Sequence, residues 1–178
     1  MDARPVLLLD FDGVLNVRGD WEGATWDLAS PLGRGTLHAD GFGWPIRWAP
    51  GLVARLVALH ASGRVDIRWC STWIEHGTAQ IEDLLGLPPF PHAYALQAGE
   101  RHSAAKARAA LGVVAEGRPL IWADDDAIPF TGPAGRLRRR PGVLLLEPSE
   151  WSGLRPSDLD AVDAFLAAVA SAGAGEGR

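Results

Sequence analysis

The sequence predicts an α/β fold, a Rossmann-like three-layer sandwich around a mostly parallel central sheet. Short apolar runs alternate along the chain with stretches of helical periodicity, which is the pattern of strand–helix–strand units. The length of 178 residues suits one hydrophobic core. Hydrophobic residues make up 47% of the chain and charged residues 22%, which is ordinary globular usage and excludes disorder, collagen and coiled coil as the main class.

The first half of the chain supplies two predicted strands and two predicted helices. Residues 6–9 form a continuous apolar run, which is typical of a strand buried on both faces. Residues 50–62 place leucines at helical spacing behind Pro50, and proline suits a first helical turn. Residues 65–70 are a second strand candidate, and residues 74–85 carry apolar side chains along one helical side.

The second half continues the alternation. Ser103 can cap a helix over residues 103–111, which a glycine follows. Apolar runs at residues 120–123 and 143–146 predict two more strands. Residues 156–170 open with proline and serine and have an apolar face at helical spacing, so a final helix is expected.

Two segments depart from this pattern. Residues 16–49 are rich in Gly and Trp and have no clear period. Long irregular loops are uncommon in compact domains unless they are functional, so we expect a hairpin-like flap there, short for a full cap domain. Residues 171–178 are small and polar and are expected to form a flexible tail, which leaves a single domain over residues 1–170.

Composition excludes several classes of function. The net charge is −5 at pH 7, so the chain lacks the global basic field of a nucleic-acid-binding protein, although a local patch stays open. The single cysteine, Cys70, excludes an internal disulfide and a multi-cysteine zinc site, and its apolar neighbours favour a buried strand thiol. No apolar run approaches the length of a membrane helix, about 20 residues. A cytoplasmic protein with no membrane contact, no signal peptide and no protein partner is expected.

Polar residues follow three of the predicted strands at the point where each strand ends. Asp10 and Asp12 follow the first strand, Ser71 follows the second, and the acidic run 124–126 follows the third. Because ligands of open α/β sheets bind beyond the carboxyl ends of the strands, these side chains are expected at one edge of the sheet. Lys106 lies near the start of the intervening helix and adds an ammonium to the same edge.

The acidic pair at the first strand has two structural alternatives. A calcium loop places acidic residues or Asn at its first, third and fifth positions and Gly at its sixth. Here Gly13 occupies the fourth position and Val14 the fifth, so that alternative fails. A solvated acidic turn is disfavoured by the apolar run that precedes the pair.

Lys106 is the only lysine among the 17 basic residues. A surface lysine on an alanine-rich helix is the structural alternative. However, three residues after a Ser103 cap it would lie in the first helical turn, where the helix dipole disfavours a cation. A bound phosphate would favour a cation there, so a functional role is expected.

The same residues resemble the haloacid dehalogenase (HAD) superfamily of phosphohydrolases over nearly the whole chain. The first motif of that family is similar to VLLLDFDGVL at residues 6–15, the second to IRWCS at residues 67–71, and the fourth, in its double-acid form, to LIWADD at residues 120–125. Lys106 matches the third motif. The four motifs together, in this order and spacing, are specific.

The resemblance implies a phosphomonoester hydrolase that works through an aspartyl-phosphate intermediate. Asp10 is the expected nucleophile, and Asp12 is the expected general acid and then general base. Ser71 would hydrogen-bond a phosphoryl oxygen, and Lys106 would contribute positive charge to the phosphate. Asp12 also favours phosphoryl transfer over dehalogenation, since dehalogenase members of the family lack this acid.

Mg²⁺ is the expected cofactor, because it relieves the repulsion between a carboxylate nucleophile and a phosphate dianion. Its expected ligands are Asp10, the backbone carbonyl of Asp12 and Asp125. Asp124 is expected either as a further ligand or as the group that orients Asp125. Asp126 is expected to be a loop or capping residue.

The expected substrate is a phosphorylated small molecule or a nucleic-acid end, with a nucleotide or nucleic-acid end preferred. The eight Trp serve either as core packing or as a stacking wall for a base. Weaker substrate-binding candidates are Gly13, Thr72, Trp73 and Arg139. Thr72 would replace Ser71 if the second strand ended one residue later. Arg139 belongs to the basic run 136–140, which is either a solvated loop or a grip for a polyanion.

A narrower resemblance supports the preference for nucleic acid. The run DFDGVLN at residues 10–16 and the WADD signature at residues 122–125 are similar to the small HAD domain attached to multi-enzyme RNA-repair proteins. Two other functions stay open. One is a phosphotransferase that uses the same aspartyl-phosphate, and the other is a non-catalytic protein that binds a phosphoryl ligand or regulates on this scaffold.

Overall fold

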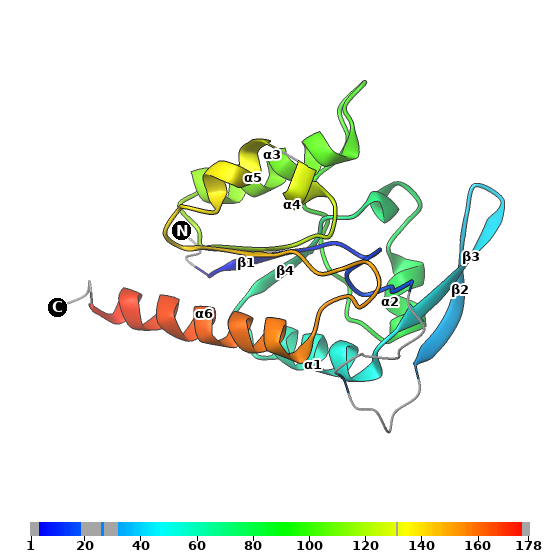
Figure 1. Ribbon diagram of the computed structural model, residues 1–178, viewed down its shortest axis with the longest axis horizontal. Coiled ribbons are helices and arrows are strands. Elements are labelled where there is room, and N and C mark those ends of the chain that lie inside the picture. The colour runs from blue at the N-terminus through cyan, green and yellow to red at the C-terminus, as the bar shows by residue number, and fades with distance from the viewer. Residues whose placement is uncertain (1–3, 19–25, 27–31, 131, 176–178) are drawn as a thin grey trace.

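The computed structural model describes residues 4–18, 26, 32–130 and 132–175. Its centre is a sheet of four parallel strands in the order β4–β1–β5–β6, with helices on both faces (Figure 1). The α/β class and the parallel sheet expected from the sequence are confirmed. In the part of the chain that is described, no helix has the length and apolar character needed to cross a membrane.

β1 (Val6–Leu9) is a central strand of the sheet. It pairs with β4 (Asp66–Trp69) on one side and with β5 (Leu120–Ala123) on the other, and β6 (Val143–Leu146) pairs with β5. The carboxyl ends are level, because the last residue of β1 is in register with the last residues of both neighbours. The residues that follow these strands therefore gather at one edge of the sheet.

Helices cover the two faces of the sheet. α1 (Pro50–Ala61) and α6 (Pro156–Gly175) lie on one face, and α3 (His102–Ala115), α4 (Ala127–Phe130) and α5 (Gly132–Leu137) lie on the other (Figure 1). The side chains of β1 alternate between the two cores, since its odd-numbered leucines pack with α1 and α6 and its other residues pack with α3. Burial on both faces explains why the strands are continuous apolar runs.

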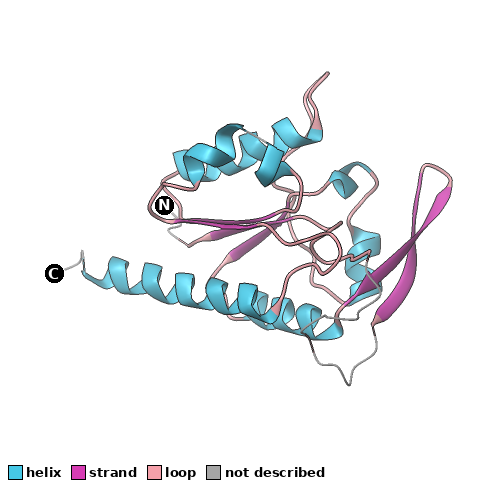
Figure 2. Cartoon of the chain, in the orientation of Figure 1, coloured by secondary structure: helices cyan, strands magenta, loops and turns pink. Residues whose placement is uncertain are grey.

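The predicted flap contains an antiparallel hairpin that projects from the body of the protein (Figure 2). Its strands are β2 (Gly33–Ala39) and β3 (Phe42–Trp48). The turn residues Asp40 and Gly41 both have positive φ, 53° and 80°, as a two-residue hairpin turn of this kind requires. Residues 19–25 and 27–31 of the predicted flap, including Trp21, lie outside the described residues.

The hairpin rests on α2 (Ala79–Leu85). Gly35 of β2 packs against Leu84 so closely that a Cβ at this glycine would lie 2.6 Å from a leucine methyl carbon. α2 is shorter than the helix expected over residues 74–85. The chain first forms a 3₁₀ helix, η1 (Thr72–Glu75), and then turns at Gly77, whose φ of 88° interrupts any helix.

The boundaries of α3 and α6 also differ from the prediction. α3 begins at His102 behind Arg101, so Ser103 lies inside the helix and caps nothing. The helix also continues to Ala115, because buried Val113 and Val114 hold its last turn on the sheet at the modest cost of a helical glycine. α6 extends through residues 171–175, which were expected to be a flexible tail, and residues 176–178 lie outside the described chain.

Candidate active site

The carboxylate of Asp10 is the centre of the candidate site, directly beyond the carboxyl end of β1. The residue is only 4% exposed. Its Oδ1 accepts a hydrogen bond from the backbone N–H of Phe11 at 2.7 Å, and its Oδ2 accepts one from Nζ of Lys106 at 2.5 Å. Burial raises the pKa of Asp10, and Lys106 offsets this only in part. The carboxylate is thus oriented, shielded from water and paired with a cation.

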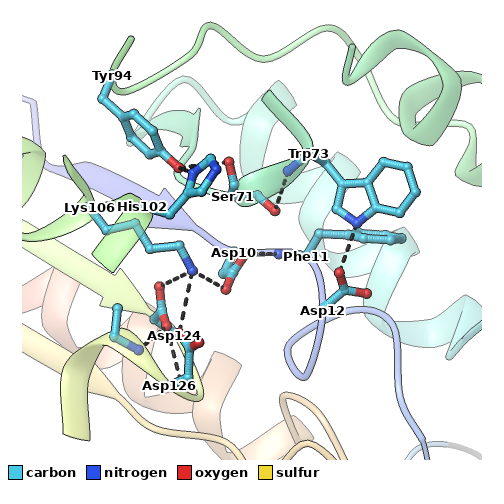
Figure 3. A network of polar contacts seen from close by, with 11 residues as sticks. Asp10, Phe11, Asp12, Ser71, Trp73, Tyr94, His102, Lys106, Asp124 and Asp126 are labelled. Carbon is cyan, nitrogen blue, oxygen red and sulfur yellow. Dashed lines mark hydrogen bonds and ion pairs between the residues drawn. The ribbon is translucent and has the colours of Figure 1, made fainter. Parts of the chain in front are cut away.

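Lys106 is a buried ammonium on α3 that faces three carboxylates (Figure 3). Besides Asp10, its Nζ lies 2.9 Å from Asp124 and 3.6 Å from Asp126. Burial alone would lower the pKa of the ammonium, but these carboxylates together raise it. The prediction that Lys106 lies in the first helical turn is wrong, since α3 begins four residues earlier. Acidic neighbours, rather than the helix end, account for its position.

Four carboxylates crowd this edge of the sheet. Asp10, Asp124, Asp125 and Asp126 each offer an oxygen atom, and these atoms lie within 4.8 Å of one another. Burial and the charge of Asp10 raise the pKa of Asp124 to about 8. Burial, Asp10 and Asp126 raise the pKa of Asp125 to about 6. Among the described residues, Lys106 supplies one positive charge against these four carboxylates, so the cluster favours a further cation. Asp126, expected as a loop or capping residue, belongs to it.

The two carboxylate oxygen atoms of Asp124 have different roles, one in capping a helix and one in the acidic cluster. Oδ1 accepts hydrogen bonds from the backbone N–H groups of Asp126 and Ala127 at 3.1 and 2.7 Å and so caps α4. Oδ2 is buried and has no aligned hydrogen-bond donor among the described residues, although it forms an ion pair with Lys106. Mg²⁺ prefers carboxylate oxygens, so this unsatisfied atom and its acidic neighbours fit a divalent cation.

Asp12 lies on the opposite side of Asp10 from Lys106 (Figure 3). Its exposed carboxylate accepts hydrogen bonds from Nε1 of Trp73 at 2.8 Å and from Nδ2 of Asn16 at 2.7 Å. Trp73 is buried, and its ring packs edge-on against Phe11 with 6.0 Å between the ring centroids. Trp73, predicted to bind substrate, therefore holds Asp12 in place. Sequence reasoning missed Asn16, whose spacing of four residues from Asp12 was the available signal.

Gly13 has a structural reason to be glycine. Its φ is 70°, and a Cβ there would lie 2.1 Å from Oδ2 of Asp125. The carboxylate of Asp125 thus occupies the space that any other side chain would need. Gly13 was expected to contact substrate. In the structure, its lack of a side chain leaves space for Asp125, a predicted metal ligand.

Ser71 and Thr72 have different surroundings. Ser71 is fully buried, and its hydroxyl accepts a hydrogen bond from the backbone N–H of Trp73 at 3.4 Å. Hydrogen bonding by the same hydroxyl lowers the pKa of Asp10 against the larger effect of burial. Thr72 is exposed at the start of η1. Of the two candidates, Ser71 is the one beside Asp10.

A chain of hydrogen bonds from the surface to Ser71 was missed by the sequence reasoning. Oε2 of Glu75 lies 2.7 Å from Nε2 of His102, and Nδ1 of His102 lies 3.0 Å from the hydroxyl of Tyr94. That hydroxyl donates to the backbone carbonyl of Ser71 at 2.9 Å. The chain ties α3 to the turn that carries Ser71 and Trp73. Its members lie 8 to 27 residues apart in sequence, so no local pattern announces it.

Arg139 is not brought to the site. It is exposed in the turn after α5. The next residue, Arg140, borders a hollow shared with Pro119 and Gly142, at the amino ends of β5 and β6. The acidic cluster lies beyond the carboxyl ends of these strands. Arg138 of the same basic run forms an ion pair with Glu147, which is a contact within the fold.

Comparison of the chain with protein-family models, with curated proteins and with solved structures finds no match.

Proposed function

We propose that this protein is a Mg²⁺-dependent phosphomonoester hydrolase of the HAD type that acts on a nucleotide or a nucleic-acid end. One observation carries the proposal. Two carboxylates two residues apart have opposite environments, since Asp10 is buried against Lys106 and Asp12 is exposed and held by two neutral donors. Such a division suits one carboxylate as nucleophile and the other as proton donor.

The first chemical step is transfer of the phosphoryl group to Asp10. A carboxylate oxygen of Asp10 forms a bond to phosphorus, and the bond between phosphorus and the ester oxygen breaks. Asp12 gives its proton to the departing oxygen, which leaves as an alcohol. Lys106 and the hydroxyl of Ser71 hold phosphoryl oxygens during the transfer, since both groups already lie beside Asp10.

The second step returns Asp10 to its free form. A water oxygen attacks phosphorus, Asp12 takes the proton from that water, and the bond between phosphorus and Asp10 breaks. Asp10, Asp125 and Asp124 would hold Mg²⁺, together with the backbone carbonyl of Asp12. When bound, the ion supplies the positive charge that lets a carboxylate approach a phosphate dianion. Asp126, at the exposed rim of the cluster, adds negative charge that strengthens cation binding.

The test is phosphate release from an aryl phosphate whose phenolate leaves without a proton. We expect activity with Mg²⁺, none after chelation, and none in Asp10→Asn. Asp12→Asn should still transfer the phosphoryl group but hydrolyse it slowly, because only the second step then needs a base. Intact-protein mass spectrometry should therefore detect a phosphorylated Asp12→Asn protein.

The control is Asp83→Asn, which removes an exposed carboxylate on α2 that does not belong to the acidic cluster. It should behave as wild type. Full activity in Asp10→Asn would refute the proposal, and activity that survives chelation would refute the metal. Adding an alcohol as acceptor separates the phosphotransferase alternative, because transfer would then yield a new phosphate ester in place of free phosphate. If neither wild type nor any variant releases phosphate from a panel of nucleotides and phosphorylated oligonucleotides, the result would favour a non-catalytic binding protein.

A further inference from the structure

Two hollows meet at Asp12, which lines both of them. The larger has a volume of about 520 Å³, and the smaller of about 230 Å³. Of the residues that the structure describes, four line both hollows: Asp12, Asn16, Trp44 and Pro45. Ligand pockets in proteins are commonly about 300–1,000 Å³, so the larger hollow alone has the size of a small-molecule site.

The hairpin presents an aromatic ring to these hollows. Trp44 lies opposite Leu37 in the β2–β3 register, so the two side chains share one face of the hairpin. Leu37 is buried in the core, whereas Trp44 is 51% exposed. A large indole that lines a hollow and remains half exposed has ring surface available for a ligand.

The position of Trp44 relative to Asp12 is set by direct contacts. The backbone N–H of Arg47 donates to Oδ1 of Asn16 at 3.0 Å, and the N–H of Val17 donates to the carbonyl of Arg47 at 3.0 Å. Nδ2 of the same Asn16 donates to Asp12. Asn16 thus joins the carboxylate of Asp12 to β3, the strand that carries Trp44. This link fixes the position of the hollows relative to Asp12.

The rim of the hollows is polar and carries both signs of charge. Arg18 lines the larger hollow, and its guanidinium is 3.1 Å from Glu150. Asp40 and His76 line the smaller hollow, with 3.8 Å between their nearest side-chain atoms. Donors and acceptors around an aromatic wall suit a planar heteroaromatic ring better than a hydrocarbon chain or a bare sugar.

We propose that these hollows bind the leaving group of the substrate and that this group is a nucleoside whose base stacks on Trp44. The inference rests on the proposed function in one respect, namely that Asp12 protonates the departing oxygen. The group attached to that oxygen must then lie on the Asp12 side, where the hollows are. Trp44 selects the substrate class, and the acidic cluster around Asp10 performs the chemistry without contacting the base.

The kinetic test compares adenosine monophosphate with ribose phosphate, which lacks the base. Wild type should have the higher kcat/KM for adenosine monophosphate. Trp44→Ala should lower that value about 5- to 150-fold, since stacking of a base on an aromatic side chain is worth about 1–3 kcal/mol. The value for ribose phosphate should not change. Trp44→Phe should recover part of the loss.

Phe42→Ala is the matched control. Phe42 is an exposed aromatic on the same strand face, 68% exposed, and it lines neither hollow. This variant should keep the preference for the base-bearing substrate. Equal loss in Phe42→Ala and Trp44→Ala would overturn the assignment to Trp44. Stronger turnover of a phosphotyrosine peptide than of adenosine monophosphate would overturn the assignment to a nucleoside.

A binding measurement separates this inference from the proposed function. Adenosine and ribose are titrated into the wild-type protein and followed by calorimetry, because neither ligand has an ester to hydrolyse. Tighter binding of adenosine that Trp44→Ala removes supports the inference even if no phosphate ester is turned over. Equal binding of adenosine and ribose overturns it even if the protein is a phosphatase. A phosphorylated oligonucleotide, run beside adenosine monophosphate, shows whether the nucleoside comes from a strand end or from a free nucleotide, and either source supports the inference.

Discussion

Replacing Gly13 by alanine should impair Mg²⁺-dependent phosphate release much more than it lowers the stability of the fold. A Cβ at Gly13 would lie 2.1 Å from Oδ2 and 2.2 Å from Cγ of Asp125. Carbon atoms in contact prefer about 3.5–4.0 Å, so the carboxyl group of Asp125 must move by more than about 1 Å. A misplacement of about 1 Å at a reacting centre can cost about 100-fold in rate. We therefore expect Gly13→Ala to lose about two orders of magnitude in Mg²⁺-dependent phosphate release.

The backbone strain of this substitution has its own control. Gly13 and Gly63 have similar φ values, 70° and 65°, but a Cβ at Gly63 would meet no atom of the described residues within 4 Å. An L-residue in this conformation costs about 1–2 kcal/mol in either place. Each variant should therefore lose roughly 2–8 °C in Tm, given roughly 2–4 °C per kcal/mol for a chain of this size. Only Gly13→Ala adds the overlap with Asp125.

The assay is thermal unfolding by circular dichroism with and without Mg²⁺, beside phosphate release. Wild type and Gly63→Ala should both gain Tm on addition of Mg²⁺, because a ligand that binds the folded state stabilises it. Gly13→Ala should gain little. An equal Mg²⁺ response in the two variants would show that the position of Asp125 does not govern the metal site, and the reasoning would be refuted.

Three further predictions concern the buried charges. Lys106→Met leaves buried carboxylates without their ammonium, so it should cost about 3–5 kcal/mol of folding free energy and abolish phosphate release. The pKa of Asp124 is raised by burial from 3.8 to about 8 on folding. This group therefore contributes stability that is complete below its unfolded pKa and is lost as pH rises to about 8, and Mg²⁺ should remove the dependence. His102 should carry a hydrogen on Nδ1, because the hydroxyl hydrogen of Tyr94 is used on a backbone carbonyl and Nδ1 must then donate to that hydroxyl.

Each of these predictions has a specific check. Denaturant unfolding of Lys106→Met measures the loss of folding free energy, and a free energy of unfolding equal to that of wild type would contradict the prediction. Tm measured against pH without metal should be flatter in Asp124→Asn than in wild type, and an unchanged slope would contradict the assignment. Nitrogen NMR of the histidine rings reports which ring nitrogen of His102 carries the hydrogen, and an Nδ1 without hydrogen would show that the hydrogen-bond roles are different.

Much of the fold could be predicted because its signals are local. β1, β5 and β6 lie where their apolar runs predict them, since burial on both faces of a parallel sheet demands continuous apolar residues. Helix ends were predicted less well. Ser103 is a good capping residue in isolation, but the N-cap of α3 lies two residues earlier, at Arg101.

The candidate site divides in the same way. Asp10, Asp12, Asp124 and Asp125 could be placed at one edge from sequence alone, because each lies within three residues of the end of a strand and parallel strands end together. Ser71 and Lys106 were also expected at this edge, and both lie beside Asp10. The tertiary structure excluded Arg139, which is exposed in the turn after α5. Only the tertiary structure shows the hydrogen bonds that Trp73 and Asn16 donate to Asp12. The same is true of the hydrogen bonds of Tyr94.

Lys106 shows most clearly what the sequence determined and what it left to the tertiary structure. The sequence marked it as unusual, as the only lysine of the chain. That it is buried against Asp10, Asp124 and Asp126 follows only from the packing of α3 on the sheet. The physical reason is that strand and turn preferences act between neighbours in the chain. The partner of a buried charge depends on which helix face meets which strand end, and residues 96 positions apart meet there.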